Sequence, residues 1–362
     1  MNRPMEELLR ETVHDLAGEA RTATDLATGA RVRGRRLRRR RQAGYVVAVV
    51  LLAALTTVPY AVLRDTALPP LPPSTGISSA PVPQTSRWSA KEPFGLPGGT
   101  VITGVGGVST ETGTGQSLVL ERNAKQYKAL PASTTASWPS PNGRWVAVQD
   151  DQRAGQIGVR RVSTGNIQWL PGEKLSGPAW SPDGDRLLLT TEEGGFAVVT
   201  AATAAVKTHS VDQSKFACTD SCQYSWLPQG DQVAIALTAG HVSEAERDRV
   251  EGLAIFAAAT GAPVRTVPVP GAPVGQDAWS PDGRLVLIEP ERLDSSDLRI
   301  AEVETGRVLG TFRAWSGQFL RDGSILGLDD GAVTRYDASG RALQKVILPT
   351  FLARREFTVG PA

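Results

Sequence analysis

The stretch Ala179–Gly184, AWSPDG, occurs a second time, letter for letter, at Ala278–Gly283. Its serine suits the first position of a type I turn, its proline fixes φ at the second, and its aspartate and glycine suit the third and fourth. A hydrophobic run follows each copy, at residues 186–189 and 284–288, and predicts a strand. The stretch therefore predicts a strand that ends in tryptophan, a tight turn and a second strand. The residues assigned to this structural motif are Trp180, Asp183, Gly184, Trp279, Asp282 and Gly283.

Weaker copies of the turn indicate that it belongs to a repeat. Its glycine recurs at positions 143, 184, 230, 283 and 323, with spacings of 41, 46, 53 and 40 residues. A second turn, Thr-Gly or Ser-Gly, lies between two short apolar runs in four of the units, and valine, isoleucine and threonine are frequent throughout. This period and composition are typical of four-stranded propeller blades rather than of helix pairs.

A WSPDG turn, a strand and a TG hairpin together resemble the repeats of the TolB C-terminal propeller and of related WD-repeat-like propellers, over roughly residues 97–360. The resemblance implies an all-β propeller but no particular activity, because such propellers serve different functions in different families. Two positions depart from the pattern: Trp138 lies one residue early, and Gln229 replaces the aspartate of the third copy. The separate N-terminal domain of TolB has no counterpart here, so its role and partners are not carried over.

The strands outside the five turn motifs predict a sixth blade. Three short apolar runs, at residues 101–104, 117–120 and 127–130, precede the first motif, and residues 357–359 supply one more strand at the far end. A blade built from both ends of the propeller would close a six-bladed ring and leave only short, protected strand edges.

The segment before the propeller predicts a membrane anchor. Residues 45–63 contain no charge over 19 positions, which is long enough for a transmembrane helix. Eight arginines lie between Arg31 and Arg41, so the positive-inside rule places the N-terminus in the cytoplasm and the propeller outside. A cleaved signal peptide is disfavoured by the long apolar core and by the 44 residues that precede it. We therefore predict a cytoplasmic tail at residues 1–44, a transmembrane helix at 45–63, a proline-rich linker at 64–96 and the propeller at 97–362.

The predicted tail carries eleven arginines against six acidic residues, a net charge of +5. Apolar residues between Met5 and Leu16 have the spacing of an amphipathic helix. The arginines act as a topology signal and can contact anionic lipid, or they form a docking segment for a cytoplasmic protein. Nucleic-acid binding is disfavoured, because no aromatic residues are interleaved among them.

A search for chemistry yields no catalytic residue, no cofactor motif and no metal site. The three histidines, His14, His209 and His241, include no pair with metal-ligand spacing, and there is no P-loop, no G-x-S-x-G elbow and no H-E-x-x-H. Cys218 and Cys222 are the only cysteines, and their place in the exported part favours a disulfide over a metal pair or free thiols.

Topology points to one end of the propeller as a candidate binding face. The loops between the second and third strands of each blade share an end with the crossings between blades. Acidic residues are frequent in these loops, and the long 53-residue spacing implies an insertion around 240–251. The alternatives are an ordinary solvated surface or a negative face for a cationic ligand or protein. The candidate residues are Asp150, Asp151, Glu192, Glu193, His241, Glu244, Glu246, Glu289 and Glu291.

These observations predict a membrane-anchored, extracytoplasmic propeller that acts as a binding, scaffold or sensor module for a protein or small ligand. The alternative is a cell-surface propeller enzyme of the hydrolase or lactonase kind. Such an enzyme assembles its site from scattered loop residues, which a search for motifs does not detect.

Overall fold

The computed structural model describes residues 88–362, except for short gaps at 107–108, 111–112, 115, 154–155, 172–174, 213–222, 239–248, 276, 291–294, 330 and 354. The chain divides into two units, residues 1–76 and 77–362, and every described residue belongs to the second. The predicted tail, transmembrane helix and most of the predicted linker lie outside the described residues. Within the described part of the chain, no helix is both long and apolar enough to span a bilayer.

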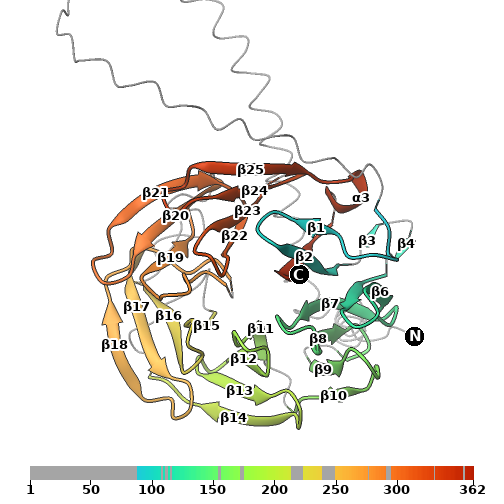
Figure 1. Ribbon diagram of the computed structural model, residues 1–362. Coiled ribbons are helices and arrows are strands. Elements are labelled where there is room, and N and C mark those ends of the chain that lie inside the picture. Colours follow the sequence, from blue (N-terminus) through green and yellow to red (C-terminus); the bar gives the residue numbers. More distant parts are fainter. Residues whose placement is uncertain are drawn as a thin grey trace, which may run out of the picture. The chain divides into compact units, whose positions relative to one another are not determined.

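Six antiparallel sheets are arranged as blades around a central axis (Figure 1). The predicted all-β fold with six blades is therefore confirmed for this part of the chain. We number the blades along the chain, call the strands of each blade a to d from the axis outward, and give their bounds in that order. Blade 1 contains β26 (Phe357–Pro361), β2 (Thr100–Val105), β5 (Leu118–Glu121) and β6 (Gln126–Ala129), blade 2 contains β7 (Thr134–Pro139), β8 (Trp145–Asp150), β9 (Ile157–Arg161) and β10 (Ile167–Trp169), and blade 3 contains β11 (Leu175–Trp180), β12 (Arg186–Thr191), β13 (Phe196–Thr200) and β14 (Ala205–His209). Blade 4 contains β15 (Ser225–Trp226), β16 (Gln232–Thr238), β17 (Val250–Ala257) and β18 (Pro263–Val267), blade 5 contains β19 (Leu285–Ile288), β20 (Asp297–Glu302) and β21 (Val308–Arg313) as strands b to d, and blade 6 contains β22 (Ser316–Phe319), β23 (Ile325–Asp329), β24 (Ala332–Tyr336) and β25 (Ala342–Ile347).

The last strand of the chain closes the ring. β26 pairs antiparallel with β2, with Ile102 opposite Val359 and Thr100 opposite Pro361. The hydroxyl groups of Thr103 and Thr358 lie 3.0 Å apart in the same pairing. The prediction that residues near 357–359 complete the first blade is confirmed, and blade 1 unites segments about 250 residues apart in the sequence.

Antiparallel pairing fixes what lies at each end of the propeller. The a–b and c–d turns share one end, which we call the turn end, and the b–c loops and d–a crossings share the other, which we call the loop end. The AWSPDG motifs form a–b turns: the amide of Gly283 donates to the carbonyl of Ser280 (2.8 Å), and Gly283 has φ of +72°. The motif therefore marks the same corner of blades 3 and 5.

Tryptophan at the end of strand a joins each of three blades to the one before it. The indole Nε1 of Trp180 donates to the carbonyl of Trp138 in blade 2 (2.7 Å), and that of Trp226 donates to the carbonyl of Ala179 in blade 3 (3.0 Å). The indole of Trp279 donates to the hydroxyl of Ser225 in blade 4 (3.2 Å). We term these three contacts the indole relay. Buried indole N–H groups need such partners, so the relay fixes the spacing of neighbouring inner strands.

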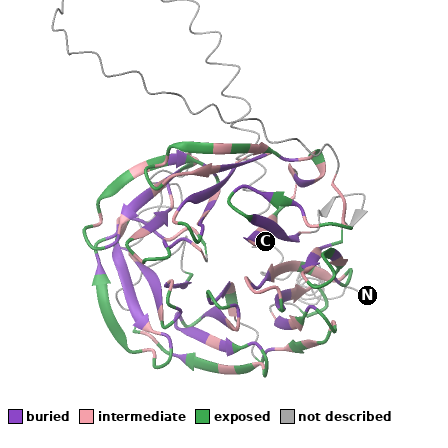
Figure 2. Cartoon of the chain, in the orientation of Figure 1, coloured by how far each residue is buried: buried purple, intermediate pink, exposed green. Residues whose placement is uncertain are grey.

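The hydrophobic core lies between the blades rather than in one central mass. Trp180 and Trp279 are 1% and 5% exposed, so both motif tryptophans are buried. The middle strands are mostly buried, while the outermost strands are largely exposed (Figure 2). Among the described residues, one buried apolar cluster lies between blades 1 and 2 and consists of Val119, Leu130, Val146, Val148 and Val162.

The propeller begins before residue 97. Trp88 stacks on Phe351 with ring centroids 5.5 Å apart, and Phe94 and Leu96 are buried against blades 1 and 6. β1 (Gly95–Leu96) pairs with β2, and α3 (Thr350–Ala353) carries Phe351 in the crossing from blade 6 to blade 1. Residues 88–96, which the sequence assigned to the linker, therefore form part of the folded unit.

Blade 5 has an irregular inner strand. Two isolated bridges, Pro273 to Ile288 and Trp279 to Val286, replace a continuous pairing beside β19. Val274 donates to Leu287 and Glu289 donates to Ala272, so Pro273 sits where its nitrogen faces away from β19 and the proline is tolerated. The chain leaves the pairing after Val274, at Gly275, whose φ is +87°. A two-stranded ribbon, β3 (Ser109–Thr110) with β4 (Gly113–Thr114), lies in the b–c loop of blade 1.

In blade 5, the c–d turn has no room for a side chain at its glycine, whereas the a–b turn does. Both Gly306 and Gly283 have positive φ (+68° and +72°). A Cβ on Gly306 would lie 1.9 Å from the carbonyl oxygen of Pro268, whereas the atom nearest to a Cβ on Gly283 would be 3.9 Å away.

Gly283→Ala should lower the free energy of unfolding by about 1 kcal/mol, because the strain of positive φ is partly offset by a stiffer unfolded chain. Gly306→Ala should cost at least about 2 kcal/mol more, because it also forces two backbones apart. Denaturant unfolding of both variants checks this, and equal losses would contradict the close approach of blades 4 and 5.

Candidate binding surfaces

The motif aspartates hold the a–b turns together. Asp282 accepts a hydrogen bond from the Ser280 hydroxyl (2.6 Å) and one from the amide of Arg284 (3.1 Å). The same serine oxygen accepts a hydrogen bond from the amide of Leu285 (2.9 Å) at the start of strand b. These contacts satisfy the polar groups of a turn whose serine is buried, and they give the aspartate a structural role within its own turn.

Blade 2 builds the same turn without a negative charge. Asn142 occupies the aspartate position, and its Oδ1 accepts from the Ser140 hydroxyl (2.8 Å) and from the amide of Arg144 (2.9 Å). Its Nδ2 donates to the carbonyl of Asp183 in blade 3 (2.8 Å). An amide therefore meets the geometric demands of the turn, and the charge of the aspartate is not required for it.

The described candidate carboxylates lie at the loop end, but in separate loops. Asp150 ends strand b of blade 2 and Asp151 follows it. Glu192 and Glu193 lie in the b–c turn of blade 3, and Glu289 follows strand b of blade 5. Glu192 and Glu193 are exposed, whereas Glu289 is half-buried. Among residues 88–362, where described, no group of three or more histidine, cysteine, aspartate or glutamate side chains is arranged to hold a metal ion. The loop end is thus a charged rim rather than a convergent site.

Two arginines, Arg153 and Arg313, offset part of the negative charge at the loop end. Burial acts to raise the pKa of Asp150, but hydrogen bonds from Ser133 (2.6 Å) and from the amide of Gln152 (2.9 Å), with the charge of Arg153, lower it overall. In blade 6, Asp329 lies 3.6 Å from the Nε of Arg313. Asp150 therefore stays ionised at neutral pH, and Glu192 and Glu193 of blade 3 are exposed carboxylates of the same rim.

Several candidate residues lie outside the described residues. They are Cys218, Cys222, His241, Glu244, Glu246 and Glu291. The predicted disulfide and the predicted insertion in blade 4 therefore stay predictions.

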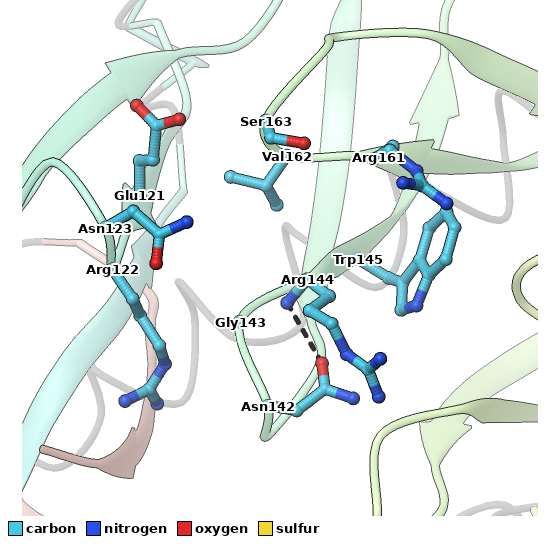
Figure 3. Close-up of a pocket in the computed structure, with 10 residues that line it drawn as sticks. All are labelled: Glu121, Arg122, Asn123, Asn142, Gly143, Arg144, Trp145, Arg161, Val162 and Ser163. Atoms are coloured by element: carbon cyan, nitrogen blue, oxygen red, sulfur yellow. Dashed lines mark hydrogen bonds between the residues drawn. The ribbon is translucent and has the colours of Figure 1, made fainter.

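The sequence did not point to a pocket at the turn end, between blades 1 and 2. Its volume is about 320 Å³, and ten residues from the c–d turns of both blades and the a–b turn of blade 2 line it (Figure 3). Three of them are arginines: Arg122, Arg144 and Arg161. The lining comes from three turns separated along the chain, so no local motif reveals it. The one local signal was Asn142 in place of the motif aspartate.

No family model matches the chain, and no curated protein is similar to it. The class of the protein, a six-bladed β-propeller, therefore rests on the geometry itself.

Replacing Asp282 by asparagine should change how stability depends on pH. The Ser280 hydroxyl and the amide of Arg284 hold the pKa of Asp282 below its ordinary value of 3.8, so the carboxylate stabilises the fold above that pH and the benefit is lost as pH falls through the folded-state pKa. Asn142 shows that an amide can make the same contacts. Asp282→Asn should therefore be less stable than wild type at neutral pH, and the difference should shrink below pH 3.8. Urea unfolding between pH 7 and pH 2 measures this, and a difference independent of pH would contradict the assigned role of the charge.

Proposed function

We propose that this protein is a membrane-anchored, extracytoplasmic propeller of TolB-like repeat type that binds a cationic partner through its loop end. The anchor is the apolar segment 45–63, with the arginine-rich tail on the cytoplasmic side. The propeller fold is consistent with a binding or scaffold role, since such rings present several loops together on a rigid frame.

The observation that supports this function best is the strand order. Because every blade is antiparallel and begins at the axis, its b–c loop must lie at the loop end. Carboxylates of blades 2, 3, 5 and 6 are thereby gathered at one end of the ring, although the sequence separates Asp150 from Asp329 by almost half the chain. Exposed charges of one sign raise the local concentration of an oppositely charged partner and speed its association.

The partner is best described as a basic protein surface or a cationic ligand. Glu192 and Glu193 are exposed neighbours in the b–c turn of blade 3 and would contact it first. Their effect would be on the rate of association more than on the lifetime of the complex, as for other charges at the rim of an interface.

The tail would serve a second, cytoplasmic contact. Its net charge of +5 favours the anionic inner leaflet, and its predicted amphipathic helix would dock on a cytoplasmic protein. A protein with binding segments on both sides of a membrane can act as a scaffold or a sensor.

Charge reversal at the loop end tests this function. The partner is first captured from the cell's own envelope fraction with the full-length wild-type protein and purified. Its association rate is then measured against Glu192→Lys/Glu193→Lys, which should associate at least about 10-fold more slowly at low ionic strength. The wild-type rate should fall with added salt, because salt screens exposed charges.

The matched control makes the same change of charge at the turn end. Asp231 and Glu304 are exposed there, in an a–b and a c–d turn, and Asp231→Lys/Glu304→Lys should leave the association rate within about twofold of wild type. Equal effects of the two pairs would indicate only a response to net charge and would reject the loop end as the binding surface.

A further inference from the structure

A buried histidine lies at the seam between blades 3 and 4. His209 ends β14, the outermost strand of blade 3 (Figure 1), and is 7% exposed. Its ring packs against the fully buried Phe196 of the same blade, with ring centroids 4.9 Å apart. It also meets the c–d turn of blade 4, where a Cβ on Gly261 would lie 2.9 Å from Nδ1 of the imidazole. The imidazole is therefore part of the contact between two blades.

Two side chains of β14 hold this turn, which comprises residues 258–261. Lys207 donates from Nζ to the carbonyl of Ala259 (2.7 Å). The backbone of Thr260 and Ala258 lies within hydrogen-bonding reach of the imidazole of His209. The outer strand of blade 3 therefore holds the turn of blade 4 through one ammonium group and one imidazole.

The second nitrogen of the imidazole is unsatisfied. Nε2 of His209 is buried and has no hydrogen-bond partner among the described residues. In the neutral ring with its proton on Nδ1, this nitrogen is an acceptor that lacks a donor, whereas the protonated ring places an N–H and a positive charge there. An unpaired buried charge costs much more than an unpaired neutral acceptor. The seam therefore favours the neutral ring.

The nearest charge on the same strand strengthens this preference. Burial, and then the positive charge of Lys207, lower the pKa of His209 from its ordinary value of 6.5. The backbone of Thr260 and Ala258 acts in the opposite direction, with a smaller effect. The imidazole is therefore neutral at pH 7.

The elements packed against the ring supply little compensation for a charged imidazole. Burial raises the pKa of Tyr224, in the crossing into blade 4, and its hydroxyl donates to the carbonyl of Gly194 (3.0 Å). The carboxylates on the adjoining turns are exposed, so solvent screens their charge. They are Glu192 and Glu193 in the b–c turn of blade 3 and Asp231 in the a–b turn of blade 4.

The turn of blade 4 is the side of this contact that can yield. Phe196 also packs against Tyr224 and Phe256, with ring centroids 5.0 and 6.5 Å away, so the aromatic side of the histidine is a packed core. The turn lies at the surface instead, with Ala259 and Thr260 exposed. Displacement of the turn would admit water to the imidazole and leave the aromatic core in place.

We propose that His209 is an acid-sensitive latch between blades 3 and 4, which holds the c–d turn of blade 4 while neutral and releases it when protonated. The sign follows from linkage: because the folded-state pKa lies below 6.5, the stabilisation is complete above pH 6.5 and is lost as the pH falls through the lowered value. The latch is independent of the proposed loop-end function, because its test needs no partner.

Hydrogen exchange of the full-length protein in detergent micelles tests the latch at pH 7 and pH 5, after correction for intrinsic exchange rates. The amides of Ala258 and Gly261 donate to the carbonyls of Asp231 (2.9 Å) and Ala257 (2.8 Å). Their protection should fall at least about threefold at the lower pH, while that of β23 in blade 6 stays unchanged. Unchanged protection of the turn, or an equal loss in β23, would overturn the proposal.

Variants distinguish the latch from a general response to acid. His209→Asn removes the titrating ring but leaves a side-chain amide near the place of Nδ1, so protection of the turn should be equal at the two pH values within about twofold. The matched control His209→Asn/Thr208→His keeps the number of histidines and moves one to an exposed position of the same strand, and it should behave in the same way. A loss on acidification as large as that of wild type, in either variant, would reject His209 as the latch.

Direct titration of the wild-type protein does not depend on the variants. With histidine labelled at Cε1, the three histidines give three resonances, and that of His209 is identified by its nuclear Overhauser contact with Phe196. Its midpoint should lie below pH 6.5 and coincide with the loss of protection in the turn. A midpoint at or above pH 6.5 would contradict the latch.

Discussion

The pairing of β26 with β2 is the contact on which the other features of this propeller depend. It brings the last residues of the chain into the first blade, so that blade 6 and blade 2 each have a complete neighbour. Without it, the inner edge of β2 would expose unpaired backbone groups, and the cluster shared by blades 6 and 1 would lose Val359. The pocket depends on the same closure, because Arg122 reaches Pro141 only if blade 1 is held beside blade 2.

Within the closed ring, the repeated motif performs the same two structural tasks in several blades. Serine and aspartate close the a–b turn, and the tryptophan before them donates its indole N–H to the inner strand of the preceding blade. The two tasks are joined because the turn fixes where strand a ends, and the tryptophan at that end must meet its acceptor. Blade 6 has Phe319 at the corresponding place, and there a backbone bond from Phe319 to the carbonyl of Asp277 links it to blade 5 (2.9 Å). The relay is thus continued by a different group where the sequence departs from the motif.

Sequence patterns were sufficient for the fold because turn residues and strand residues alternate with a constant period. The motif glycines located the a–b turns, and the apolar run near the C-terminus identified the closing strand. Two c–d turns carried no such signal, because Lys125 and Ala204 adopt the positive φ that glycine adopts elsewhere (+50° and +52°). The irregular inner strand of blade 5 was also not predicted, since no copy of the turn motif marks the break in pairing between Pro273 and Trp279.

The candidate sites were less accessible to sequence reasoning. Topology alone placed Asp150, Glu192 and Glu289 at one end, because alternation of strands decides the end to which a loop belongs. It gave no information on which carboxylates are compensated, as Asp329 is by Arg313, because that depends on side chains from different blades. The pocket was missed for the same reason: its lining comes from turns of two blades that are separated along the chain.

Hydrogen exchange in a variant that lacks residues 357–362 tests ring closure most directly. If β26 holds the ring together, the amides of β2, β5 and blade 6 should lose protection, and the unfolding midpoint should fall well below that of a variant that lacks only Ala362. Protection of β2 and blade 6 equal to that of the full-length chain, with an unchanged midpoint, would contradict the role assigned to the closing strand.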